Sequence, residues 1–375
     1  MAAIYIHIPY CKQACHYCNF YFSTKLKTKS QFLNALQNEI ILKQKDIKDR
    51  INSIYIGGGT PSVLSFLELE KIITFIKNNF HINNDVEITI EINPDDIKNG
   101  QLDDYKKIGF NRLSIGVQSF NDKDLKLMNR RHNACQAILL LEDVSKKFKN
   151  FSIDLIYGIP GSNFDIWKKN IQTALSFSPN HISAYALTIE EKTVFFNWIK
   201  NKKLNKLNEK IIYDQFEYLI EKLEKSGYEH YEISNFAKNK KYSVCNKSYW
   251  NGDKYFGFGP SAHSFNGKLR SWNKASIHEY ITSINDGKLT YKSEKLTKID
   301  RYNEHIMFGL RTNKGISKKN ILDNFGLDFF KEFIGKVNKH LNQKNLFEDG
   351  DFIKSSRKSL FIIDGIISDF FIVND

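Results

Sequence analysis

The chain has 375 residues, a hydrophobic content of 41% and a formal net charge of +13. This length and apolar content allow two or three domains with a large core, and the basic residues are spread along the chain, which argues against a nucleic-acid platform. No basic-then-apolar leader opens the sequence, and the most apolar run, 360–373, is too short to cross a bilayer, so we expect a cytoplasmic protein.

Strand-like and helix-like segments alternate through the first half of the chain. Six segments have the pattern of strands: 4–8, 53–56, 86–92, 113–117, 152–156 and 181–187. A helical stretch follows each, the first capped by Ser30 and the second opened by a capping box from Ser65 to Glu68. This alternation favours an α/β fold with a parallel sheet curved toward a barrel, which we assign to residues 1–225.

The pattern changes near residue 288. Helical stretches are predicted around 301–310, 318–325 and 329–344, and two short segments follow around Phe352 and Phe361. We predict a C-terminal α+β domain over residues 288–375 with a winged-helix-like arrangement. Residues 226–287 are assigned to a connecting region.

Unusual polar residues and glycines collect where the predicted strands end. Cys11 follows the first strand, a run of three glycines follows the second, Glu91 ends the third and Gln118 follows the fourth, while Asp154 lies within the fifth. Chemistry in parallel barrels takes place at the carboxyl ends of the strands. These positions therefore predict one shared site.

Three of the five cysteines, Cys11, Cys15 and Cys18, lie within eight residues. The odd count and the crowding argue against a disulfide framework and for metal ligation. Closely spaced thiolates can hold a 4Fe–4S cluster, and three of them leave one iron with an open position for a reactant. The alternative is a structural zinc site with His7 or His16 as fourth ligand.

At these residues the sequence resembles the radical S-adenosylmethionine (SAM) superfamily, and within it the group of oxygen-independent coproporphyrinogen III oxidase and heme chaperones. The matching stretches are 5–11, 57–61, 91–94, 116–120 and 154–160. The resemblance covers nearly the whole chain. It implies a partial barrel of six β/α units with a C-terminal domain, and a 4Fe–4S cluster and SAM as cofactors.

The resemblance also implies which residues bind SAM. Gly58, Gly59 and Thr60 would let the backbone approach the methionine part of SAM, because glycine has no obstructing side chain. The other residues carried over to SAM are Tyr5, Tyr17, Glu91, Gln118, Arg130 and Asp154. A tight turn, a surface role or plain packing is the alternative for individual positions, and the number of SAM molecules is left open.

Two features separate the oxidase from the chaperone group. The oxidase has a further Cys two residues after the third, where this chain has Phe20, and an extension ahead of the first strand, where this sequence begins at that strand. Both favour the chaperone group. The resemblance then implies heme as a ligand, respiratory hemoproteins at the cytoplasmic membrane as recipients, peripheral association with that membrane face, and an electron donor for the cluster.

Other functions are kept as alternatives. The main alternative is oxidative decarboxylation of coproporphyrinogen III to protoporphyrinogen IX, and a remote one is radical modification of tRNA. No dense basic or aromatic platform supports a nucleic-acid partner. The sequence leaves a homodimer open.

Heme chaperones carry a motif of His, Asn, two variable residues, Tyr and Trp, whose His is implicated in holding heme. This chain has Cys245-Asn246-Lys247-Ser248-Tyr249-Trp250 at that place. Cysteine thiolate is itself a heme iron ligand, so Cys245 could preserve ligation. His263 and His230 are the other candidate ligands, and the alternative for the motif is a small buried Cys beside aromatic core residues.

Overall fold

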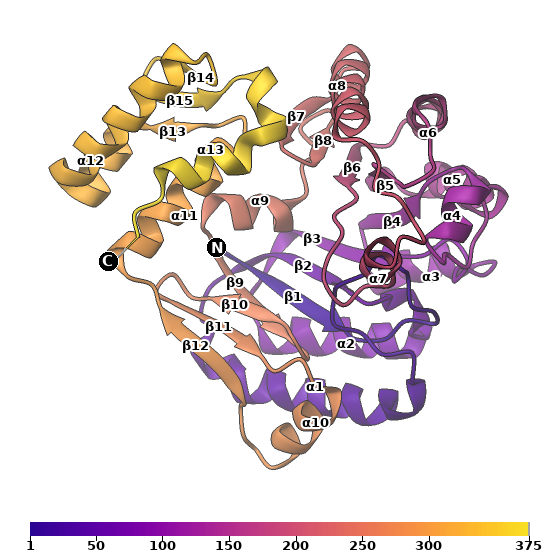
Figure 1. Ribbon diagram of the computed structural model, residues 1–375. Coiled ribbons are helices and arrows are strands. Elements are labelled where there is room, and N and C mark those ends of the chain that lie inside the picture. The colour runs from indigo at the N-terminus through magenta and orange to yellow at the C-terminus, as the bar shows by residue number, and fades with distance from the viewer. Residues whose placement is uncertain (374–375) are drawn as a thin grey trace.

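A twelve-stranded sheet organises most of the chain in the computed structural model, which describes residues 1–373 (Figure 1). The strand order is β12-β11-β10-β9-β1-β2-β3-β4-β5-β6-β8-β7. The strand bounds are β1 Ala2–Ile8, β2 Ile51–Gly58, β3 Ile82–Ile92, β4 Arg112–Gln118, β5 Phe151–Tyr157, β6 His181–Ala186, β7 Glu229–Glu232, β8 Asn235–Ala237, β9 Lys254–Phe258, β10 His263–Phe265, β11 Leu269–Asn273 and β12 Tyr291–Lys295. Strands β1 to β6 are parallel, which confirms the predicted α/β sheet and its six strands.

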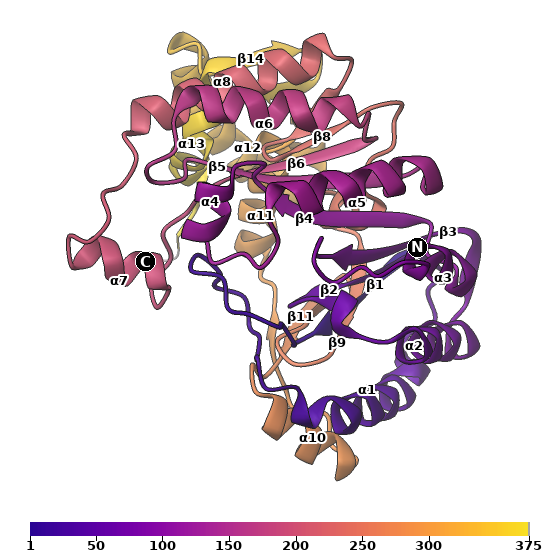
Figure 2. The same cartoon turned by 90° about the vertical axis from the view of Figure 1, so that its right-hand side faces the viewer.

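Helices follow each of the parallel strands, and most of them cover the outer face of the sheet (Figure 2). Their bounds are α1 Lys29–Lys43, α2 Phe66–Asn79, α3 Gln101–Ile108, α4 Asp122–Leu127, α5 Ala134–Lys147, α6 Phe164–Ser176, α7 Val194–Lys200 and α8 Glu209–Lys225. The capping box of α2 is confirmed, because Ser65 and Glu68 exchange side-chain to backbone hydrogen bonds. The predicted cap at Ser30 is wrong: a short 3-10 helix, Leu26–Thr28, leads into α1 without a side-chain cap.

The register of β4 shows why the interior of the curved sheet is polar. Leu113, Ile115 and Val117 are fully buried against the helices. The alternate positions, from Arg112 to Gln118, face the opposite side and line a cavity. Successive side chains of a strand point to opposite faces, so one sequence pattern builds both the apolar core and the polar interior.

The region predicted to connect the two domains adds strands to both edges of the sheet. Strands β7 and β8 follow β6 at one edge, and β9 pairs in parallel with β1 at the other. Helix α9, Val244–Asn251, lies between them in sequence and contacts β1, β2 and β9. Helix α10, Ile277–Asn285, packs on α1. The sheet thus continues through β12, beyond the predicted boundary at residue 288.

The remaining elements form a second hydrophobic core beside α9 (Figure 1). They are α11 Lys298–Leu310, β13 Ile316–Ser317, α12 Lys318–Asn342, β14 Leu346–Asp349, β15 Phe352–Ser355, a 3-10 helix Arg357–Ile362 and α13 Ile363–Phe370. The small sheet has the order β13-β15-β14. Gly326, with φ of 82°, breaks α12 where two separate helices were predicted. Helix, strand, broken helix and hairpin follow one another as in a winged helix.

Candidate functional site

One cavity of about 680 Å³ occupies the interior of the curved sheet. It brings together residues from β1 to β6, the loop after β1 and helix α9. All but one of the site residues predicted from the sequence line it: Tyr5, Cys11, Cys15, Tyr17, Cys18, Gly58, Gly59, Thr60, Glu91, Gln118, Arg130, Asp154, Cys245, Asn246 and Tyr249. The exception is Trp250, which packs on Phe308 of α11 and stacks beneath Arg311.

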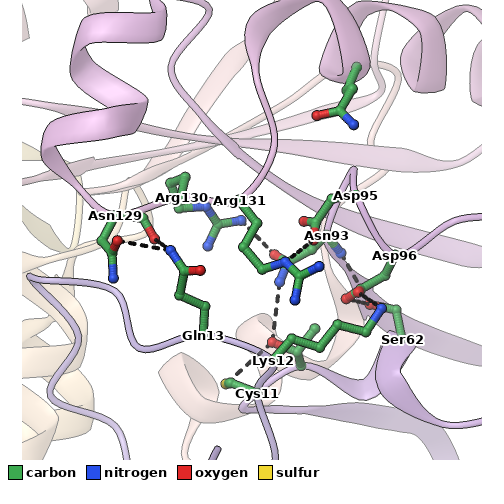
Figure 3. Close-up of polar contacts among 12 residues, drawn as sticks. Cys11, Lys12, Gln13, Ser62, Asn93, Asp95, Asp96, Asn129, Arg130 and Arg131 are labelled. Atoms are coloured by element: carbon green, nitrogen blue, oxygen red, sulfur yellow. Dashed lines mark hydrogen bonds and ion pairs between the residues drawn. The ribbon is translucent and has the colours of Figure 1, made fainter.

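The loop that carries the three cysteines is held by the segment after α4 (Figure 3). Gln13 donates from Nε2 to the carbonyl oxygen of Asn129 at 2.8 Å and to its side chain at 2.9 Å. Lys12 forms an ion pair with the buried Asp96, which also accepts a hydrogen bond from Ser62 at 2.8 Å. These contacts anchor the cysteine loop to the segments after α4 and after β3.

The three thiols lie in the mouth of the cavity with intermediate exposure. The hydroxyl of Thr60 donates to Sγ of Cys11 at 3.3 Å, and Arg130 donates from Nη1 to Sγ of Cys15 at 3.5 Å. Burial raises the pKa of Cys11 to about 12 and that of Cys18 to about 11. Thiol sulfurs are the donors that iron–sulfur clusters require, and Arg130 and Thr60 would stabilise them as thiolates.

The histidines considered for a zinc site have other partners. Nε2 of His7 lies 2.9 Å from the carbonyl oxygen of Tyr21, and its Nδ1 lies 3.1 Å from the hydroxyl of Tyr5. Nδ1 of His16 lies 2.8 Å from the carbonyl oxygen of Leu127. Within residues 1–373, no group of three or more His, Cys, Asp or Glu side chains is arranged to hold a single metal ion.

The glycine turn after β2 is required by the packing of the protein itself. Gly58 has φ of 108°, and a Cβ there would lie 2.5 Å from the ring of His7. A Cβ at Gly59 would lie 2.7 Å from the carbonyl oxygen of Tyr10. Any side chain at these two positions would collide with β1 or the cysteine loop. The turn therefore brings its backbone, with the side chain of Thr60, to the edge of the cavity.

Glu91 is the carboxylate at the centre of the cavity wall. It accepts hydrogen bonds from the hydroxyl of Tyr55 at 2.8 Å and from the backbone N–H of Gly58 at 3.1 Å. Burial, with a smaller contribution from the nearby Asp154, raises its pKa to about 7. A carboxyl with this pKa that lines a cavity is a candidate to contact a polar ligand.

Arg130 and Asp154 are held by neighbouring strands. Arg130 donates from Nη2 to the carbonyl oxygen of Gly116 at 2.7 Å and to Oδ1 of Asn93 at 2.5 Å, while its Nε is buried without a partner among the described residues (Figure 3). Asp154 accepts hydrogen bonds from Ser114 at 2.9 Å and Ser152 at 3.2 Å, and burial raises its pKa. Both side chains keep polar atoms at the cavity surface.

Helix α9 closes the end of the cavity opposite the cysteine loop. Its first N–H, from Val244, donates to the carboxylate of Glu87 at 2.9 Å, which ties the helix to β3. Cys245 is buried, with a pKa raised to about 12 by that burial and by the charge of Glu87. Tyr249 packs edge-on against Tyr255 at 4.6 Å. The motif thus presents a thiol, an amide and a phenol to the cavity.

The alternative heme ligands lie outside this cavity. His230 stacks on Phe236 at 4.2 Å, and its Nε2 is 3.1 Å from the carbonyl oxygen of Ile233. His263 is exposed on β10 and stacks on Trp272 at 5.9 Å.

Several cavity residues were not predicted from the sequence: Tyr55, Asn93, Arg112, Ser183 and Tyr185. Arg112 and Ser114 share the alternating face of β4 that ends in Gln118, so the period of the strand was a signal that could have found them.

Comparison with known proteins assigns the chain to a family. The model of the Radical SAM superfamily matches residues 5–174, and that of the HemN C-terminal domain matches residues 296–361, directly after β12. The structure of coproporphyrinogen III oxidase HemN from Escherichia coli has a TM-score of 0.86 at 24% identity, covering 98% of this chain and 89% of that one. This likeness confirms the radical SAM fold with a C-terminal domain.

Two bacterial relatives match almost from end to end. The heme chaperone HemW of Bacillus subtilis is 36% identical over 361 residues, which covers 94% of each chain. The heme chaperone HemW of Buchnera aphidicola subsp. Schizaphis graminum is 35% identical over 380 residues, which covers 98% of each. The chain therefore belongs to the family of radical SAM proteins that contains the HemW proteins.

Proposed function

We propose that this protein is a heme chaperone that binds a 4Fe–4S cluster, SAM and heme. It delivers heme to respiratory hemoproteins at the cytoplasmic membrane, with which it associates peripherally, and takes electrons from a separate donor. The main support is the single cavity that joins the three-cysteine loop to the Cys245 motif on α9. The names of the HemW relatives agree with this function. No helix within residues 1–373 is long and apolar enough to cross a membrane.

The cavity residues suit these ligands. Cys11, Cys15 and Cys18 would hold the cluster, which when bound together with SAM supplies one-electron chemistry. The residues proposed to bind SAM are Tyr5, Tyr17, Gly58, Gly59, Thr60, Glu91, Gln118, Arg130 and Asp154. Glu91 lines the cavity and accepts two hydrogen bonds, so its carboxylate keeps acceptor capacity that a polar ligand would use.

Heme is proposed to bind at the other end of the cavity. Cys245 would coordinate the iron, and Asn246 and Tyr249 would contact the ring from the same helix. Trp250, on the same helix, packs on Phe308 of α11 and does not line the cavity.

The proposed function is tested against the oxidase alternative. Phe20, whose side chain is 72% exposed beside the cysteine loop, stands where the oxidase has a further Cys. We expect reconstituted protein, incubated anaerobically with SAM, a reductant and coproporphyrinogen III, to form no protoporphyrinogen IX. The same preparation should bind one ferric heme per chain in a spectroscopic titration. Catalytic turnover to protoporphyrinogen would establish oxidase activity. Absence of stoichiometric heme binding would exclude the heme chaperone function.

SAM affinity should depend on the charge of Glu91. Its pKa of about 7 means that the ionised form increases as pH rises through neutrality. A carboxylate accepts a charge-assisted hydrogen bond from the amino group of SAM only when ionised. We expect the affinity to increase about eightfold between about pH 6 and about pH 7.5, following the ionised fraction.

Glu91→Gln should remove this pH dependence and weaken SAM binding at pH 7.5 by about 10- to 100-fold, while the cluster absorption stays. The control is Glu142→Gln, on the exposed face of α5, which should bind SAM as the wild type does. Calorimetric titration at both pH values measures the effect. Wild-type affinity in Glu91→Gln would place Glu91 outside the SAM site.

A further inference from the structure

Arg112 is a buried guanidinium that the contacts described so far do not use. It is the first residue of β4, its side chain is 2% exposed, and it lines the cavity. Its Nε has no hydrogen-bond partner among residues 1–373. A buried charge is costly unless it is paired and hydrogen-bonded, so a guanidinium that lines a cavity with its Nε unpaired is a candidate to bind an anionic group that enters the cavity.

The carboxylates near Arg112 are occupied by other donors. Glu87 is the one carboxylate of the described chain within ion-pair distance, and its oxygen lies 3.9 Å from Nε, too far for a hydrogen bond. Glu87 accepts instead from the first N–H of α9. Glu91 accepts from Tyr55 and Gly58, and Asp154 accepts from serines. No carboxylate of the described chain is thus hydrogen-bonded to Nε of Arg112.

The position of Arg112 points to one end of a long ligand. Gln118 lies six positions further along β4, which is about 20 Å along a strand, and the cysteine loop lies at the Gln118 end of the sheet. Arg112 instead lies near the start of α9, which carries Cys245, because Glu87 is 3.9 Å from its Nε and accepts the first N–H of that helix. A ligand that reaches Cys245 would bring its edge close to the guanidinium.

We propose that Arg112 binds a carboxylate group of the ligand that enters this cavity. The planar guanidinium can donate two parallel hydrogen bonds to a carboxylate, a geometry that lysine cannot reproduce. The inference rests on the proposed function, because that function names the two ligands that could supply the carboxylate. They are heme, through a propionate, and SAM, through its amino-acid carboxylate. The neighbouring Cys245 favours the heme propionate.

The test compares each ligand with an analogue that lacks the carboxylate. Wild type and Arg112→Lys are reconstituted and titrated with ferric heme and its dimethyl ester, and with SAM and decarboxylated SAM. For the ligand that supplies the carboxylate, Arg112→Lys should weaken binding of the compound that has the carboxylate about 10- to 100-fold. The affinity for its carboxylate-free analogue should stay unchanged. Lysine keeps the positive charge beside Glu87, Glu91 and Asp154, so the change isolates the paired hydrogen bonds.

Matched variants separate folding from binding. Arg357→Lys alters the surface ion pairs with Glu217 and Glu224, outside the cavity. This variant should bind heme, SAM and both analogues with wild-type affinity. Arg112→Gln, which keeps a polar side chain, replaces Arg112→Lys if the latter does not refold. Equal losses for acid and carboxylate-free forms, or no loss for either pair, would overturn the inference.

The two proposals can fail separately. If the wild type binds no heme, the proposed function fails. The comparison of SAM with decarboxylated SAM then decides alone whether Arg112 binds a carboxylate. If heme binds and neither pair responds to the variant, Arg112 has no part in ligand binding and the proposed function stands.

Discussion

Replacing Cys11, Cys15 or Cys18 by alanine is expected to abolish the iron–sulfur absorption of the reconstituted protein. The wild type, reconstituted anaerobically with iron and sulfide, should contain about four irons per chain. A cluster held by only three thiolates already has one iron without a protein ligand, so removing one thiolate leaves a second such iron and should prevent stable assembly. Iron and sulfide analysis with absorption spectra measures the result.

Cys135→Ala is the matched control for these variants. Cys135 is exposed on α5, on the outer, helical layer, and does not line the cavity. Its replacement should leave both the iron content and the spectrum at wild-type levels. A cluster spectrum that survives the loss of Cys15 would contradict the ligand assignment. Loss of the cluster in Cys135→Ala would equally do so.

Replacing Cys245 by alanine is expected to remove the thiolate-type spectrum of ferric heme bound to the protein. Burial holds the pKa of Cys245 at about 12, so the free thiol is protonated at neutral pH. Coordination to iron favours the deprotonated sulfur and would supply the free energy for this change. Cys245→His should retain heme binding with a histidine-type spectrum, because it restores the residue that the heme chaperone motif carries.

His263→Ala distinguishes the ligands. His263 is exposed on β10 outside the cavity, so its replacement should leave the heme spectrum unchanged. If Cys245→Ala binds heme as tightly as the wild type and with the same spectrum, while His263→Ala loses it, the iron ligand is His263. Heme affinity and spectra of the two variants, measured side by side, decide between these outcomes.

The six parallel strands and the cysteine loop were predictable because their signals are local. In β4 the alternation of Leu113, Ile115 and Val117 with polar residues is a property of adjacent positions, since successive side chains of a strand face opposite sides. The spacing of the three cysteines is likewise contained in one short loop. The strand ends then indicated where the polar residues would meet, as they do in parallel barrels generally.

The tertiary structure alone decided which distant segments complete the cavity. No local pattern indicates that β9 pairs with β1, or that α9 packs on β1, β2 and β9 with its first N–H bonded to Glu87 of β3, which brings Cys245 to the cavity. For the same reason Trp250, next to Tyr249 in sequence, faces α11 instead of the cavity. Arg112 could be placed on a strand from sequence, but its lack of a partner depends on which donors reach Glu87, Glu91 and Asp154. Such contacts are set by long-range packing, which adjacent residues do not encode.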